Sequence, residues 1–165
     1  MAVGLLAAAG HEVHAVTGTE SAHDYLRGLG AAEVLGRGAL ADDEGGPLQK
    51  GVWAGAVDSV GGTTLATLLA QSRRHACVAA CGLAGGAALS TTVFPFILRG
   101  VTLAGIDSNT ATPRTRTKAW DRLAEAVAGG ALSGVQKTVI GLEDVPEWAV
   151  KIVEGETVGR VVVAL

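Results

Sequence analysis

The chain has 165 residues, of which 48% are hydrophobic and 18% charged, and its formal net charge is −3. This length fits one domain with a sizeable core, and the low charged fraction argues against intrinsic disorder. A weakly acidic chain attracts neither nucleic acid nor an anionic membrane, and no apolar window reaches the ~20 residues that cross a bilayer. We therefore expect a cytoplasmic protein with no nucleic-acid or membrane partner.

The N-terminal third of the sequence is expected to alternate between helix and strand. Its elements are predicted as a helix over 2–9, a strand over 12–17, a helix over 21–29, a short strand at 33–35 and a polar loop over 38–50. Ser21 is the expected N-cap of the second helix. Gly10 and Gly30 are expected to end the two helices, because glycine readily adopts the left-handed conformation of a helix C-terminus.

Three short apolar runs between residues 52 and 108 are the most informative feature of the sequence. They predict strands over 52–57, 76–81 and 101–106, separated by a helix over 63–72 and a short helix that ends near Arg99. Runs rich in Val, Ile and Ala are typical of strands buried on both faces of a parallel sheet. Each run ends in Gly, Ser or Asp, and open α/β sheets bind nucleotide-like ligands beyond these carboxyl ends.

The C-terminal third begins with the clearest helix of the chain, over 113–128, with Pro113 in its first turn. A strand near 138–140, a helix over 145–154 and a strand over 160–165 follow. The alternation of strands and helices predicts an α/β fold, a Rossmann-like and mostly parallel sheet with helices on both faces.

Cysteine and histidine do not indicate a metal site. Cys77 and Cys81 lie four residues apart in one predicted strand, roughly 13 Å from each other at about 3.3 Å per residue, which is too far for a disulfide. We expect both to be small core residues in a reducing cytosol. The four histidines share no metal-ligand spacing and are expected in surface or core roles; they are His11, His14, His23 and His75.

The turn over residues 17–21 is a candidate for binding a ribose or a phosphate. It has hydroxyl groups, backbone N–H groups and the positive end of the next helix, although an ordinary strand–helix turn would look the same. An NAD-type site would carry an acidic residue at this strand end, and the presence of Thr17 and Thr19 favours NADP instead. The Gly-rich turn that cradles the pyrophosphate is not found upstream.

Two further features of the predicted strand ends have two readings each. Asp58 and Asp107 would either orient a ribose or cap the turns that follow their strands. The run Gly82–Gly86 would either let the backbone approach a flat ring or only form a tight corner.

Four segments together resemble the acrylyl-CoA reductase group, a zinc-free, quinone-oxidoreductase-like branch of the medium-chain dehydrogenases/reductases. They are residues 52–61, 77–86, 91–99 and 105–108. The resemblance implies NADPH-dependent reduction of an acrylyl-CoA-type double bond, with hydride transfer to the β-carbon and protonation of the α-carbon. Family members join a GroES-like domain to a Rossmann domain. We expect residues 1–165 to be a truncated Rossmann domain, without the GroES-like domain, the first strand and its Gly-rich turn, and inactive alone.

The resemblance also implies that particular residues of this chain bind the cofactor. The matching positions are Thr17 and Gly18 near the adenosine phosphate, and Leu83, Ile97 and Ser108 along the nicotinamide half. Thr19 stands where an arginine that pairs with the 2′-phosphate is expected, and Glu33 where another basic residue is common. A carboxylate near a phosphate is repulsive and a lost charge-assisted contact weakens binding, so NADH is the alternative to NADPH.

The substrate and the partners each allow more than one reading. The expected substrate is a small CoA thioester or enone, and a quinone or enone reductase of the same superfamily is the second reading. A non-catalytic nucleotide-binding remnant is the third. The expected protein partner, if any, is a second copy in a homodimer.

Overall fold

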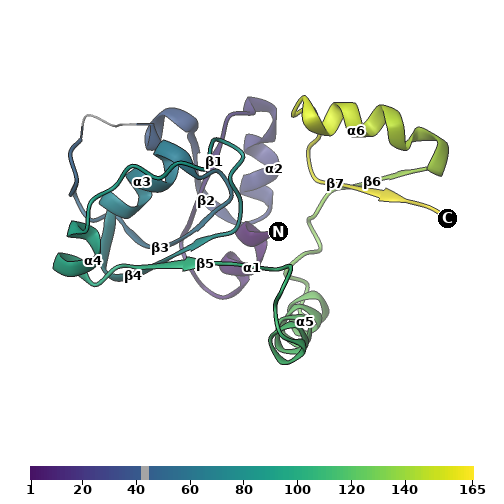
Figure 1. Ribbon diagram of the computed structural model, residues 1–165. Coiled ribbons are helices and arrows are strands. Elements are labelled where there is room, and N and C mark those ends of the chain that lie inside the picture. The colour runs from purple at the N-terminus through teal and green to yellow at the C-terminus, as the bar shows by residue number, and fades with distance from the viewer. Residues whose placement is uncertain (42–44) are drawn as a thin grey trace. The chain divides into compact units, whose positions relative to one another are not determined.

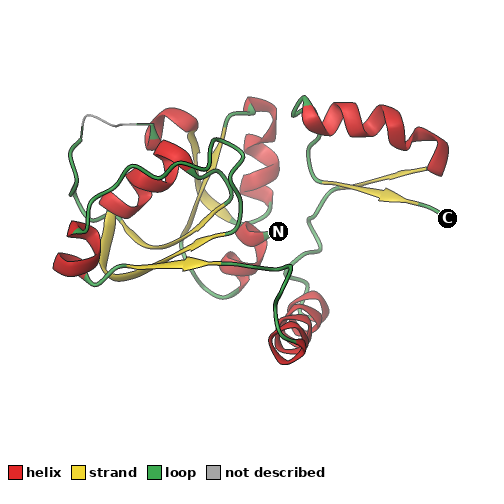
Figure 2. Cartoon of the chain, viewed as in Figure 1, coloured by secondary structure: helices red, strands yellow, loops and turns green. Residues whose placement is uncertain are grey.

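The computed structural model describes residues 1–41 and 45–165 (Figure 1). By its internal contacts the chain divides into two units, one formed by Met1–Val34 with Trp120–Leu165 and the other by Leu35–Ala119. The described strands lie in three sheets of two, three and two strands (Figure 2). Strands in the second and third sheets run parallel, so the predicted α/β class with parallel pairing is confirmed, although one continuous sheet was expected.

The three-stranded sheet lies in the unit Leu35–Ala119. Its strands are β3 (Trp53–Asp58), β4 (Ser72–Ala80) and β5 (Thr102–Gly105), in the order β3-β4-β5, and it is accompanied by α3 (Gly62–Ala70), α4 (Phe94–Arg99) and the short 3-10 helix η2 (Arg37–Leu40). β4 begins four residues earlier than predicted, because Ser72 already pairs with Trp53 of β3. A bulge follows this pair, and regular pairing resumes at Gly55 with Cys77.

The core of this unit lies between one face of the sheet and its helices. Leu65 and Leu69 of α3 cluster with Val78 of β4 and with Val101, and Phe96 of α4 packs against them. The partly buried residues of this cluster from the neighbouring strands are Ala56, Ala80 and Leu103. Burial of these side chains is the main force that holds the helices on the sheet.

The expectation that these strands are buried on both faces is wrong within this unit. Successive residues of a strand point to opposite faces, so the neighbours of the core residues Ala56 and Val78 lie on the other face. There Val57 is 51% exposed and Cys77 is exposed. α3 and α4 both pack against the face of the sheet that carries Ala56 and Val78. Among the described residues of 35–119, the opposite face, which carries Val57 and Cys77, is open to solvent.

The expectation that the cysteines are core residues is therefore also wrong. Cys77 lies on the open face of the sheet. Cys81 lies one residue beyond the end of β4, so the alternation of side chains along the strand no longer places it against the core, and it is exposed. Both are free thiols. The Cys81 thiol donates to the backbone oxygen of Asp58 at 3.2 Å.

The N-terminal part of the other unit follows the predicted order. Its elements are α1 (Ala2–Ala8), β1 (Val13–Thr17), the 3-10 helix η1 (Glu20–Ala22), α2 (His23–Gly28) and β2 (Ala31–Gly36). Gly10 and Gly30 have φ values of 83° and 98° and end their helices as predicted. The predicted N-cap Ser21 is wrong, because a 3-10 turn precedes α2 and no side chain caps either segment.

The C-terminal part of the chain contains α5 (Pro113–Ala128), β6 (Lys137–Ile140), η3 (Leu142–Asp144), α6 (Val145–Val153) and β7 (Arg160–Val163). α5 has the predicted bounds, and none of its residues is buried. β6 and β7 pair in parallel, with Lys137 opposite Arg160. None of the helices that the structure describes is both long and apolar enough to cross a membrane.

Candidate cofactor site at the strand ends

Three loops follow the carboxyl ends of β3, β4 and β5. They span residues 58–62, 81–86 and 105–110 and are called here the first, second and third loop. Because the strands are parallel, the loops meet at one edge of the sheet. Backbone pairing continues into them: Cys81 N–H donates to Asp58 C=O at 2.8 Å, and Ile106 N–H to Ala80 C=O at 2.9 Å.

The first loop is organised by the carboxylate of Asp58, which is only 2% exposed. One oxygen accepts the backbone N–H of Val60 at 3.2 Å and the other that of Gly61 at 3.0 Å. Gly61 and Gly62 then adopt φ values of 71° and 54° and lead into α3. Asp58 was expected either to orient a ribose or to cap the turn after its strand. The structure fits capping, because both carboxylate oxygens accept backbone N–H groups.

The second loop packs backbone to backbone against the first. A Cβ on Gly82 would lie 2.6 Å from the carbonyl oxygen of Ser59, and one on Gly61 would overlap the carbonyl oxygen of Gly86. The Gly85 N–H donates to Val60 C=O at 2.7 Å. Gly61, Gly82 and Gly85 are thus needed for contact between the loops, as the tight-corner reading requires, whereas Gly86 is not. Gly86 has a φ of 141°, and a Cβ there would meet nothing within 4 Å.

The third loop is organised by the carboxylate of Asp107. Its oxygens accept the hydroxyl of Thr110 and the backbone N–H groups of Thr110, at 3.1 Å, and Asn109, at 2.9 Å. These hydrogen bonds, the one from the Thr110 hydroxyl first, hold the pKa of Asp107 below its usual range. The guanidinium of Arg116 donates to the carbonyl of Ser108 at 3.2 Å, which fixes the backbone of this predicted site residue.

Leu83, Ser108 and Ile97 were predicted along the nicotinamide half of the cofactor. Leu83 lies in the second loop and is 65% exposed, and Ser108 lies in the third loop. Ile97 is 68% exposed but lies on α4, whose end contacts the start of β4 through Arg99 and Ser72. The structure thus brings Leu83 and Ser108 to the same edge but does not place Ile97 among the three loops.

Thr17, Gly18 and Thr19 follow β1 in the other unit. The Thr17 hydroxyl oxygen accepts the N–H of Thr19 at 3.1 Å and so closes a tight turn. Both threonines are half-buried and Gly18 is exposed. The Thr17 O–H and the Thr19 hydroxyl are neutral donors for a phosphate, and neither brings a positive charge.

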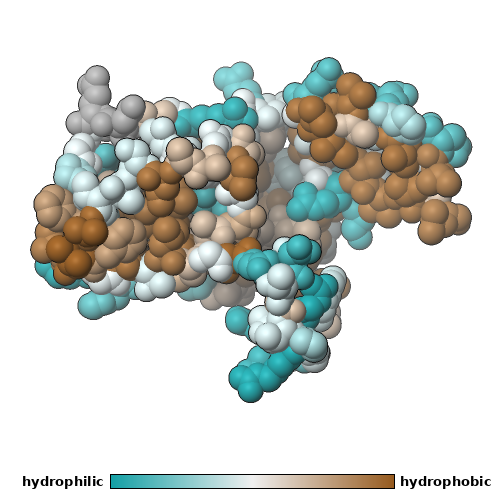
Figure 3. Space-filling model, viewed as in Figure 1, coloured by the Kyte–Doolittle hydropathy of each residue, from teal (hydrophilic) through white to brown (hydrophobic). Residues whose placement is uncertain are grey.

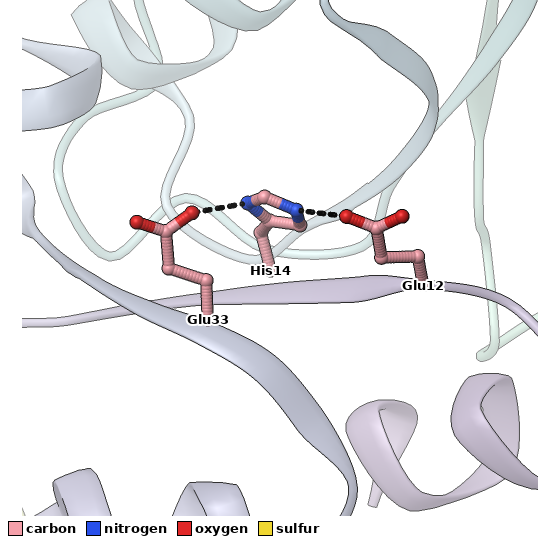
Figure 4. A network of polar contacts seen from close by, with 3 residues as sticks. All are labelled: Glu12, His14 and Glu33. Atoms are coloured by element: carbon pink, nitrogen blue, oxygen red, sulfur yellow. Dashed lines mark hydrogen bonds and ion pairs between the residues drawn. The ribbon is translucent and has the colours of Figure 1, made fainter.

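Glu33 contacts a histidine. His14 of β1 lies between two carboxylates, with its Nδ1 3.1 Å from Glu33 of β2 and its Nε2 3.2 Å from Glu12 (Figure 4). Sequence reasoning missed this cluster, because it depends on how β1 and β2 pair. The one signal in the sequence was that residues 12 and 14 share a face of the strand.

Metal ligands are not gathered at any of these places. In residues 1–41 and 45–165, no three His, Cys, Asp or Glu side chains are grouped so that they could hold a metal ion.

A parallel α/β unit whose loops meet at the carboxyl ends of its strands is typical of the class of nucleotide-binding α/β folds. Comparison with known families makes this specific: residues 1–125 match the family described as "Zinc-binding dehydrogenase". The chain belongs to this family.

Three relatives show where the chain fits within it. The acrylyl-CoA reductase AcuI of Ruegeria pomeroyi is 44% identical over 163 residues, which cover 99% of this chain and 49% of that protein. The crystal structure of the yhdH oxidoreductase of Salmonella enterica in complex with NADP is 46% identical, with a TM-score of 0.93, over 99% of this chain and 50% of that one. The crystal structure of Bacillus subtilis protein yhfP with NAD bound is 40% identical, with a TM-score of 0.93, and the match covers 99% of this chain and 50% of that one. The chain thus spans about half the length of these relatives.

Proposed function

We propose that this chain is the cofactor-binding half of an NADPH-dependent oxidoreductase that reduces the C=C bond of acrylyl-CoA or a similar enoyl or enone substrate. The observation that carries the proposal is the meeting of three loops at the carboxyl ends of β3, β4 and β5, where open α/β sheets bind nucleotides. The likeness to an acrylyl-CoA reductase and to an oxidoreductase solved with NADP supports the substrate class and the cofactor.

Three features of the strand-end loops support the binding of a flat ring and its ribose. Open space beside Gly86 lets backbone approach the ring without an intervening side chain. The exposed Leu83 offers an apolar surface for one face of the ring, and the third loop presents Ser108 with its backbone held by Arg116. When bound, NADPH would supply the hydride, and these residues would hold and orient its ring.

The cofactor preference depends on the turn after β1. Its two threonine hydroxyls would bind the 2′-phosphate of NADPH as neutral donors, which is weaker than binding by a guanidinium. Glu33 lies 3.1 Å from the Nδ1 of His14, so its carboxylate is already engaged with the imidazole ring. We therefore propose NADPH as the cofactor, with a smaller preference over NADH than arginine-bearing relatives have. Relatives solved with NADP and with NAD support both choices.

The proposal is tested with a fusion protein, in which this chain replaces the matching half of the Salmonella yhdH oxidoreductase; it is called here the joined protein. We expect the joined protein to oxidise NADPH steadily with acrylyl-CoA, and this chain alone to show no turnover. Steady turnover by the chain alone would refute the second expectation. Cofactor binding without turnover on any CoA thioester, enone or quinone would favour the non-catalytic reading, and faster turnover of quinones would favour the quinone reductase. Absence of NADPH binding would overturn the proposal.

A further inference from the structure

A cavity of about 380 Å³ lies along α3, apart from the three strand-end loops. Its walls are the segment 46–49, one side of α3, and the segment Ser90–Thr92 that leads to α4. All of these residues belong to the unit Leu35–Ala119. The volume lies at the lower end of the range that small-molecule sites occupy.

The lining is rich in hydroxyl groups. Five side chains contribute one each: Thr63, Thr67, Ser90, Thr91 and Thr92. Alanines and a proline supply the apolar part of the wall, and none of the described lining residues carries a charge. A hydroxyl both donates and accepts hydrogen bonds, whereas an anion would find no counter-charge among the described lining residues. This lining therefore favours a neutral ligand that carries hydroxyl or amide groups.

One wall is fixed by a chain of side-chain amides. Gln71 Nε2 donates to Gln49 Oε1 at 2.9 Å, and the indole N–H of Trp53 donates to Gln71 Oε1 at 2.9 Å. The backbone N–H of Gln49 also donates to the carbonyl of Ala70 at 3.0 Å. The segment before β3 is thereby tied to the C-terminal end of α3.

Arg99 ties the remaining walls together. Its guanidinium donates to the carbonyls of Ala70, at 2.9 Å, and Ser72, at 2.8 Å, and also to that of Gln49. At the other end of α4, the Thr92 hydroxyl accepts the N–H of Phe94 at 3.3 Å. The cavity is thus formed before any ligand arrives, which lowers the ordering cost of binding.

We infer that this cavity is a second small-molecule site, which takes a neutral ligand bearing hydroxyl and amide groups and not a phosphate or a carboxylate. It is independent of the cofactor proposal, because none of its lining residues belongs to the three strand-end loops. The competing occupant is ordered water, which also suits a polar cavity of this size.

The probe is panthenol, a neutral compound with hydroxyl groups and one amide. Pantothenate has the same skeleton with a terminal carboxylate and is the matched anion. Nuclear magnetic resonance of the indole N–H groups in the 165-residue chain reports binding, because Trp53 is linked to the wall through Gln71. We expect panthenol to shift the Trp53 signal saturably, and pantothenate, whose carboxylate finds no counter-charge among the described lining residues, to bind more weakly.

Three variants locate the binding. Thr63→Val removes one lining hydroxyl and should weaken panthenol binding roughly three- to ten-fold, while Thr64→Val, the same change one residue away and outside the lining, should leave it unchanged. Ala66→Leu fills the cavity and should abolish binding. The inference is overturned if no saturable shift occurs, which leaves water as the occupant, if pantothenate binds equally well, or if Thr63→Val and Thr64→Val behave alike. Retained binding in a folded Ala66→Leu variant would place the ligand elsewhere.

Discussion

Asp107 is the residue whose protonation state is tied most directly to the shape of a strand-end loop. Its carboxylate accepts hydrogen bonds from the Thr110 hydroxyl and from two backbone N–H groups, and these favour the ionised form. Since the folded-state pKa lies below the unfolded value, the ionised carboxylate stabilises the loop at neutral pH. That contribution is lost as the pH falls through the folded pKa, below the ordinary value of 3.8.

Thr110→Val removes the largest of these hydrogen bonds and should raise the pKa of Asp107 toward its ordinary value. Carboxyl carbon resonances followed through an acid titration measure this directly. Thr117→Val, a substitution of the same type outside the loop, is the control and should leave the titration of Asp107 as it was. A pKa of Asp107 that does not rise in Thr110→Val would show that the backbone donors alone determine it.

Thr19 is the residue on which cofactor choice is proposed to depend. In the protein joined to the unmatched part of yhdH, Thr19→Arg should strengthen NADPH binding by roughly ten-fold or more and leave NADH nearly unchanged, because a guanidinium–phosphate contact is charge-assisted. Dissociation constants of both cofactors for the parent and the variant give the ratio. An unchanged ratio would mean that Thr19 does not face the 2′-phosphate, and that the assignment of this turn is wrong.

At the level of elements, the first loop is the segment that one side chain holds together. Asp58→Asn replaces one accepting oxygen by a donor group, which leaves a buried backbone N–H without its acceptor. The free energy of unfolding should fall by about 1–3 kcal/mol. Urea unfolding measures the loss, with the exposed Asp121→Asn as control. A loss no larger than that of the control would show that the turn is held by its backbone bonds alone.

Most elements could be predicted from the sequence because local rules determine them. The helix over 113–128 follows its proline start and apolar periodicity, and Gly10 and Gly30 ended helices where a left-handed residue was needed. The Gly, Ser and Asp ends of the apolar runs predicted where the loops meet. Ser21 was misjudged because a 3-10 turn starts before it.

What the sequence did not reveal depends on contacts between distant segments. The early start of β4 comes from the pairing of Ser72 with Trp53, and the His14–Glu33 contact comes from two strands pairing. Cys77 looked like a core residue because an apolar run does not tell which face a helix will cover. Among the site residues, Leu83 and Ser108 directly follow strands, so the sequence indicated their place at the edge, whereas the position of Ile97 depends on how α4 packs.

At the level of the whole molecule, the exposed apolar surface of α6 and its neighbouring strands stands out (Figure 3). Its most exposed members include Val139, Val150, Ile152 and Val153, the last 87% exposed. Apolar surface of this kind marks association, so we expect the chain to form dimers or larger species at micromolar concentration. Sedimentation should show the monomer fraction rise in a Val139→Lys/Val153→Lys variant. A monomeric parent chain would contradict this expectation.

Binding of the cofactor by the three strand-end loops is tested by NADPH binding to two glycine variants of the joined protein. Gly82→Ala places a Cβ 2.6 Å from the Ser59 carbonyl oxygen and must push the second loop from the first. Gly28→Ala, in α2 and outside the three loops, meets nothing within 4 Å and is the control. We expect Gly82→Ala to weaken NADPH binding at least about ten-fold, a difference of about 1.4 kcal/mol, while Gly28→Ala stays near the parent. Equal dissociation constants in a folded Gly82→Ala variant would contradict binding of the cofactor at these loops.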